Sequence, residues 1–221
     1  ALVDAGVDQV GGESCTGLLL DLVESGEVAE SRLDESALRV LRVKFRLGLF
    51  EDPFVDVDNA ARTVGRAEFA AEARRAQSRS ITVLTNRAAG DAARPVLPLQ
   101  LHSGASVLVD GVDPDLVRAR GLSVADSADT AEVALVRLRA PFTPRDEHAL
   151  EAFFRAGTLT FPAEVEGRIL DTAAAVPTVV DVRLDRPAML GPIVGAAAAV
   201  TASRGTGDEA RLDAVFGVVP P

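Results

Sequence analysis

The feature that most constrains this fold is an alternation of short apolar runs with helical stretches in the second half of the chain. A β-branched run at residues 81–84 is followed by apolar runs at residues 107–109, 133–136, 179–182 and 197–200; the helical stretches are residues 114–120, 144–155, 162–175 and 208–216. Strands buried on both faces read as continuous apolar runs, and strands that alternate with helices form parallel sheets. Residues 81–221 are therefore predicted to form a three-layer α/β/α sandwich with a mainly parallel sheet. Its functional loops are expected at the carboxyl ends of the strands.

The first part of the chain has a helical rhythm instead. Leu38, Leu41 and Phe45 recur at spacings of three and four, which predicts one apolar helix face. Gly48 follows as the left-handed residue that ends this helix, and residues 31–34 resemble a capping box at its start.

Three further elements are expected around that helix. A helix from Thr16, as its N-cap, ends before Gly26. Residues 53–66 have the composition of an extended linker, and residues 67–80 that of another helix.

Composition excludes several function classes. The chain of 221 residues carries a formal charge of −10, which disfavours nucleic acid as a partner, and no apolar run approaches the roughly 20 residues that span a bilayer. Lys44 is the one lysine, and no phosphate-binding GxxxxGK[ST] pattern occurs. The single cysteine, Cys15, leaves the redox compartment open. His102 and His148 are far apart in the sequence, so neither a metal nor a cofactor is expected.

One segment concentrates ionisable side chains after a predicted buried strand. Residues 138–159 contain Arg145, Asp146, Glu147, His148 and Glu151, and open α/β sheets present such loops to ligands. The simpler interpretation is also open, because acidic residues are common in the first turn of a helix, where they suit the helix dipole.

Several stretches resemble glycoside hydrolase family 3, the β-glucosidase and related exo-glycosidase family. They include RVLRVKFRLGLF at residues 39–50, in which the block from Lys44 to Phe50 is the most specific. SRLDES at residues 31–36 precedes it and DPFVD at residues 52–56 follows it. LDRP at residues 184–187 and GDEA at residues 207–210 are also similar to family segments. The resemblance covers nearly the whole chain.

The resemblance implies a barrel of the (β/α)8 type followed by an α/β sandwich, with the active site between them. On this interpretation residues 1–50 are the last strand and helices of an incomplete barrel domain, residues 51–80 a linker and first helix, and residues 81–221 the C-terminal sandwich domain. The chain is then expected to be a piece of a longer one, and the loop at residues 11–14, with Glu13, to line the rim of the pocket.

The resemblance also implies retaining hydrolysis of β-linked glycosides or oligosaccharides by two carboxylates. The family's nucleophilic Asp belongs to an earlier barrel strand, so the chain alone is expected to be inactive. The acid/base is expected from residues 141–151, with Glu147 as the first candidate and Glu151 as the second. Arg145 and Glu13 are expected to contact substrate.

Two other functions remain open from the sequence. The chain can be a non-catalytic α/β domain for interaction or oligomerisation, or an unrelated doubly wound binding module, although residues 25–56 argue against the latter. The apolar helix faces within residues 1–50 predict self-association.

Overall fold

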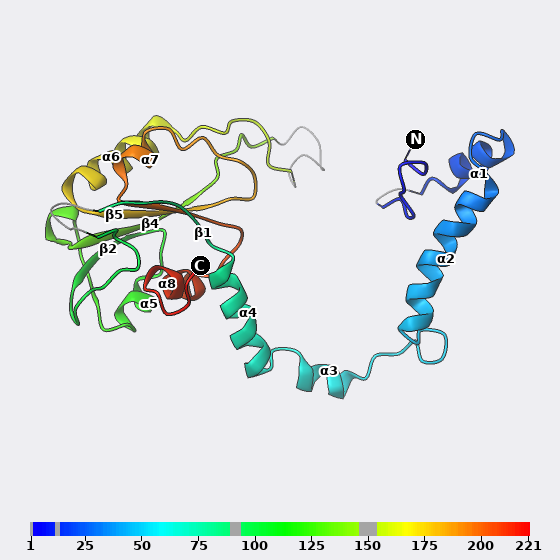
Figure 1. Ribbon diagram of the computed structural model, residues 1–221, viewed down its shortest axis with the longest axis horizontal. Helices are drawn as coiled ribbons and strands as arrows, with labels where there is room; N and C mark the ends of the chain where they lie inside the picture. Colours follow the sequence, from blue (N-terminus) through cyan, green and yellow to red (C-terminus); the bar gives the residue numbers. More distant parts are fainter. Residues whose placement is uncertain (1, 12–13, 89–93, 146–153) are drawn as a thin grey trace. The chain divides into compact units, whose positions relative to one another are not determined.

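The computed structural model of this chain describes residues 2–11, 14–88, 94–145 and 154–221 (Figure 1). The chain divides into two compact units, Ala1–Val64 and Gly65–Pro221. None of the helices in the described ranges combines the length and the apolar composition needed to cross a membrane.

The described residues of the first unit form three helices, α1 (Thr16–Glu24), α2 (Glu30–Arg46) and α3 (Val57–Thr63). Gly48 has a φ of +69° just beyond α2, as expected for the glycine that ends a helix. Two expected starts were wrong: Cys15, not Thr16, precedes α1, and α2 begins at Glu30, so that Ser31 lies within the helix. The reason is that helical hydrogen bonding begins earlier than expected: the backbone N–H of Leu19 donates to Cys15 O at 3.1 Å, and that of Arg32 donates to Ala29 O at 2.9 Å.

The expected extended linker at residues 53–66 was also wrong over half of its length, because residues 57–63 form α3. Asp56 caps this helix by accepting a hydrogen bond from the backbone N–H of Asn59 at 2.9 Å.

Asp8 ties the segment before α1 to α2. Its Oδ1 accepts hydrogen bonds from Ser36 Oγ at 2.8 Å and from Arg39 Nη1 at 2.7 Å, and Arg32 donates to the same oxygen at 3.4 Å. The hydrogen bond from Ser36, followed by that from Arg39, lowers the pKa of Asp8 below its ordinary value. The carboxylate is therefore the form that holds residues 2–8 on this helix.

Within the part of the second unit that the structure describes, six strands form one sheet in the order β1-β6-β5-β4-β2-β3. The strands are β1 (Thr82–Asn86), β2 (Ser106–Asp110), β3 (Ser123–Val124), β4 (Val133–Arg139), β5 (Thr178–Arg183) and β6 (Ala199–Ser203). The helices are α4 (Ala67–Arg79), α5 (Pro114–Arg118), α6 (Ala163–Ala175), α7 (Ile193–Ala196) and α8 (Asp208–Val215), with a 3₁₀ turn η1 (Ala128–Thr130).

Helices cover both faces of the sheet, so the predicted three-layer α/β sandwich is confirmed (Figure 1). On the α5 and α8 side, Val117 and Leu212 pack on Leu135 of β4. On the α6 and α7 side, Ile169 and Ile193 pack in the second core cluster. Residues along β4 and β5 alternate between these two cores, which is why both strands are apolar throughout most of their length.

The sheet departs from the expected pattern at its two edges. β1 runs antiparallel to β6, whereas the remaining neighbours are parallel. β3 has two residues, too few to leave a pattern in the sequence. The predicted strand at residues 197–200 begins later, at Ala199, because α7 occupies the residues before it.

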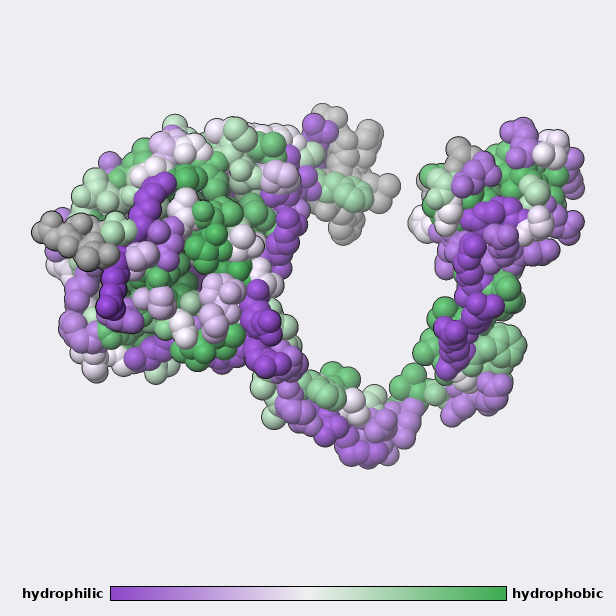
Figure 2. Space-filling view, in the orientation of Figure 1, coloured by the Kyte–Doolittle hydropathy of each residue, from purple (hydrophilic) through white to green (hydrophobic). Residues whose placement is uncertain are grey.

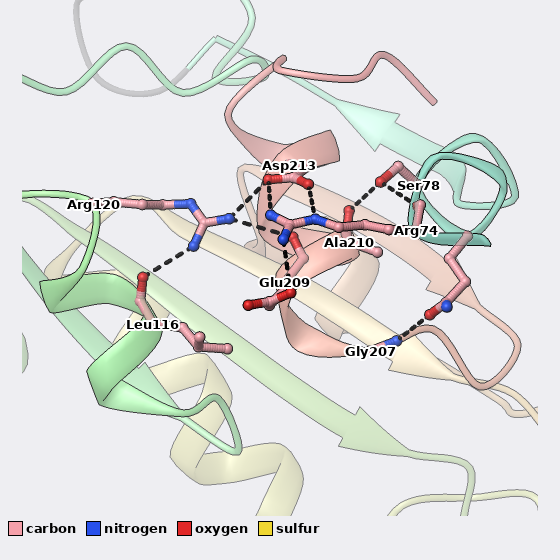
Figure 3. A network of polar contacts seen from close by, with 9 residues as sticks. Arg74, Ser78, Leu116, Arg120, Gly207, Glu209, Ala210 and Asp213 are labelled. Atoms are coloured by element: carbon pink, nitrogen blue, oxygen red, sulfur yellow. Dashed lines mark hydrogen bonds and ion pairs between the residues drawn. The ribbon is translucent and has the colours of Figure 1, made fainter. Parts of the chain in front are cut away.

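Asp213 of α8 forms ion pairs with α4 and with the turn that follows α5 (Figure 3). Arg74 of α4 donates to it from Nε at 2.6 Å and from Nη2 at 2.9 Å, and Arg120, beyond α5, donates from Nη2 at 2.8 Å. Ser78 Oγ, fully buried, also donates to Ala210 O at 2.8 Å. These contacts fix α4 to the sandwich, so α4 belongs with the second unit rather than with the segment before it.

Candidate functional site

Strands β2, β4, β5 and β6 are parallel and end at the same edge of the sheet. The loops that leave this carboxyl edge follow Asp110, Arg139, Arg183 and Ser203. Ligands of open α/β sheets bind at such edges, so the edge is the candidate site.

The loop after β4 is closed at its stem. The backbone N–H of Thr143 donates to Ala156 O at 2.8 Å, and that of Thr158 donates to Thr143 Oγ1 at 3.0 Å. Gly157 has a φ of +77°, and a Cβ at this residue would lie 2.2 Å from Thr143 Oγ1. A glycine is therefore required both by the backbone angle and by the close approach of Thr143.

The same stem is bound to the loop after β5. Arg155 forms an ion pair with Asp185, and its guanidinium carbon lies 5.0 Å from the centroid of the Phe142 ring. Arg186 Nη2 donates to Gly157 O at 3.0 Å. The backbone N–H of Met189 donates to Leu159 O at 2.8 Å. The two loops thus form one connected surface at the carboxyl edge.

A buried group of charges lies beneath this edge, on the α8 side of the sheet. Asp181 of β5 is fully buried and accepts hydrogen bonds from Thr201 Oγ1 and Ser203 Oγ, each at 2.8 Å. Its Oδ2 lies 3.5 Å from Arg137 Nε and 3.7 Å from Arg211 Nε. Two hydroxyl donors and two cations therefore compensate one buried carboxylate.

Arg211 is the deepest of these charges. Its Nη2 donates to Val136 O at 3.3 Å, while Nε and Nη1 have no hydrogen-bond partner within the described part of the chain. Loss of water on burial lowers the pKa of Arg211, and Asp181 opposes that effect. Arg137 also pairs with Asp208 at the start of α8, so two arginines and two aspartates form the group. This arrangement holds α8 against the ends of β4 and β5.

The sequence-predicted site residues fall mostly where the structure gives no description. Glu147, Glu151 and Glu13 lie outside the described residues, as do most of residues 144–155, which were expected to be helical. Arg145 is described and is exposed, at the last described position before residue 146. The assignments of these four side chains therefore stay predictions.

His102 lies before β2, at the amino end of that strand and away from the carboxyl edge, and Cys15 belongs to the first unit. His102 Nε2 is 3.2 Å from Glu132 Oε2, and a hydrogen bond with the Ser103 carbonyl, more than Glu132, raises the pKa of His102. Cys15 is a half-buried free thiol. Over residues 2–11, 14–88, 94–145 and 154–221, no group of His, Cys, Asp and Glu side chains is arranged to hold a metal ion.

Sequence reasoning missed the residues that connect the loops. Asp185 and Arg186 stood out only as part of the LDRP segment that resembles the family, and they bind the loop after β4 in the same unit. Arg155 was not singled out as a site residue. Asp181 was not singled out either, although a lone carboxylate inside an apolar run is a signal that could have marked the buried group.

No family model matches the chain. Individual curated proteins do match. β-Glucosidase C of Emericella nidulans is 41% identical over 221 residues, which is 100% of this chain and 35% of that protein. A periplasmic β-glucosidase/β-xylosidase of Dickeya chrysanthemi is 35% identical over 214 residues, 96% of this chain and 31% of that protein. The chain is homologous to one portion of the β-glucosidases of glycoside hydrolase family 3. The resemblance seen at residues 31–56 is thereby confirmed.

Solved family 3 structures share the fold of this chain. The β-glucosidase of Listeria innocua, in complex with glucose, matches 98% of this chain and 34% of its own with a TM-score of 0.66 at 20% identity. A family 3 β-glucosidase of Bifidobacterium adolescentis matches 98% of this chain and 36% of its own with a TM-score of 0.60 at 21% identity. The chain thus spans about a third of the length of the relatives that it matches.

Proposed function

We propose that this chain is the C-terminal portion of a retaining, exo-acting glycoside hydrolase that cleaves β-linked glycosides. The observation that carries the proposal is the 41% identity to β-glucosidase C along the whole of this chain. The solved relatives described with glucose, isofagomine or laminaribiose bound support a β-glycoside as the ligand.

In this proposal the loop after β4 supplies the general acid/base. Glu147 is the first candidate and Glu151 the second, while Arg145 and Glu13 contact the sugar. Retaining hydrolysis needs two carboxyl groups about 5–5.5 Å apart, one ionised and one with a raised pKa. The nucleophilic carboxylate comes from the part of the enzyme that this chain does not cover, so the chain by itself is inactive.

The division of the chain follows from the same proposal. Residues 1–50 are the end of a barrel domain, residues 51–80 the linker and first helix, and residues 81–221 the sandwich domain.

We also propose that residues 1–50 mediate self-association of the isolated chain, since the large apolar side chains Leu38 and Phe45 of α2 are exposed at 56% and 59%.

The test of the acid/base is Glu147→Gln in the longer enzyme, with Glu151→Gln beside it. An acid matters most when the leaving group is poor, so Glu147→Gln is expected to lower turnover of alkyl glycosides by about 10²–10⁴-fold and that of activated aryl glycosides much less. Equal turnover of the variant and the parent on both substrate types would remove Glu147 from the mechanism. The same selective loss in Glu151→Gln would assign the role to Glu151.

A further inference from the structure

A cavity of about 550 Å³ lies on the α6 and α7 side of the sheet, where β5 and β6 end. Three strands contribute to its floor, through Leu84 of β1, Val182 of β5 and Ala202 of β6. Ala202 is the partner of Val182 in the ladder, so one methyl group stands where the neighbouring strands carry larger side chains. This small residue leaves a hollow at the end of β6, and Leu84 beside it stays 47% exposed.

The loop after β5 forms the wall of the cavity. Leu184, Ala188 and Leu190 of this loop pack against the second core cluster and also line the cavity. The lining is therefore mostly apolar, with a few polar side chains. A cavity of this size and composition is typical of a site for a small organic molecule.

Two arginines add positive charge to this apolar cavity. Arg204 follows β6, is exposed, and forms no ion pair with a described residue. Arg186 Nη2 donates to Gly157 O at 3.0 Å, whereas its Nη1 is buried without a hydrogen-bond partner in the described part of the chain. Asp185 is the one carboxylate among the lining residues that the structure describes, and Arg155 already pairs with it.

A surplus of positive charge at one cavity stands out in a chain whose formal charge is −10. Guanidinium groups bind carboxylates strongly, because their N–H donors match the two carboxylate oxygens. Arg204 is free to make such a contact, and the unpaired end of Arg186 adds charge to the same cavity. The cavity therefore suits a ligand with an apolar body and one anionic group.

We propose that this cavity binds a small organic carboxylate with an aromatic or aliphatic body. Arg204 contacts the carboxylate, Arg186 supports it with a second positive charge, and the apolar floor and wall contact the body. The inference goes beyond the proposed function and does not depend on it, because no residue of the cavity is argued to take part in hydrolysis.

The experiment measures binding to the longer enzyme by calorimetry with three probes. 4-Phenylbutyrate combines a carboxylate with an apolar body, 4-phenylbutyramide is its uncharged analogue, and acetate is the anion without the body. We expect 4-phenylbutyrate to bind at least about 10-fold more tightly than either of the other two, because the amide loses the charge-assisted hydrogen bonds and acetate loses the apolar burial.

Variants of the lining assign the binding to this cavity. Arg204→Gln should weaken the binding of 4-phenylbutyrate about 10-fold and leave that of the amide unchanged, whereas Ala188→Leu fills the cavity and should weaken both. Arg79→Gln, which removes an exposed arginine of α4, is the control and should bind like the parent. The methyl NMR signals of Val182 and Leu190 should shift when 4-phenylbutyrate is added.

Equal affinity for 4-phenylbutyrate and the amide, or for 4-phenylbutyrate and acetate, would overturn the proposed ligand class. Undiminished binding to Ala188→Leu, or methyl signals that do not move, would put the ligand elsewhere and overturn the site, as would a parent that binds none of the probes. Cleavage of a β-glycoside does not enter these measurements, so the proposed function can fail while this site stands, and the reverse.

Discussion

At the scale of single residues, Asp181 shows how a charge is accommodated inside this sheet. Its carboxylate is fully buried, and both of its oxygens accept hydroxyl hydrogen bonds. Arg137 and Arg211 supply the compensating charge. A buried carboxylate of this kind gives little net stability compared with a well-packed apolar residue, but its removal leaves buried cations unpaired.

Asp181→Asn tests that statement with almost no change in volume. The amide would turn N–H donors toward groups that also donate, so we expect the free energy of unfolding to fall by about 3–5 kcal/mol. Urea denaturation of the variant and of the exposed control Asp171→Asn measures the difference. A loss as small as that of the control would show that the arginines find other partners.

Single residues were also the hardest to predict from sequence. The roles of Glu147 and Arg145 are predictions that rest on the resemblance. The Arg155–Asp185 ion pair was not predicted, because it joins loops 30 positions apart and leaves no periodic signal. Asp181 could be noticed, since one carboxylate interrupts an apolar run, but its partner Arg211 looked like any polar position on a helix.

At the scale of elements, α4 is attached to α8 by a carboxylate whose ionisation matters. Hydrogen bonds from Arg74, and secondarily from Arg120, lower the pKa of Asp213, while its partial burial opposes them. A carboxyl group with a folded-state pKa below its unfolded value stabilises the fold fully above the unfolded pKa. This stabilisation is lost as the pH falls through the folded-state value.

Asp213→Asn should therefore destabilise the protein by about 2 kcal/mol at neutral pH, the usual contribution of hydrogen bonds to a charged group. The difference in the free energy of unfolding between the variant and the parent should shrink as the pH drops below 3.8, the ordinary pKa of this carboxyl group. Thermal or urea unfolding at pH 7 and near pH 2.5 checks this, with the exposed Asp126→Asn as the control. A gap that stays constant over this range would contradict it.

Elements with strong local patterns were predicted well, and those held by tertiary contacts were not. The end of α2 at Gly48 and the apolar cores of β4 and β5 follow from spacing and burial. The antiparallel direction of β1 is set by its pairing with β6, more than a hundred residues away, and no local pattern encodes it.

At the scale of the whole molecule, the first unit leaves apolar side chains unburied. Leu38, Leu41 and Phe45 of α2 are 56%, 42% and 59% exposed, and Figure 2 shows hydrophobic residues on the surface of this unit. Apolar area of this extent favours association of soluble chains.

We expect the isolated chain to form dimers or larger species at micromolar concentration in sedimentation experiments. The double variant Leu38→Glu/Phe45→Glu should restore the monomer, because it charges the exposed face of α2. Val218→Glu, which puts the same charge at an exposed apolar position of the second unit, should not. A parent that sediments as a compact monomer would refute association through residues 1–50.

The strand order has a consequence for how the chain folds during synthesis. β1 pairs with β6, and α4 is held by α8, so the earliest elements of the sandwich depend on its latest ones. As the polypeptide leaves the ribosome, Val83 and Leu84 of β1 have no strand to pair with and no helix to pack on until residues 199–215 have been synthesised. Contacts so distant in sequence form slowly. The nascent chain therefore presents an unpaired strand while residues 87–198 are synthesised, which is the state that chaperones bind and that premature termination would leave behind.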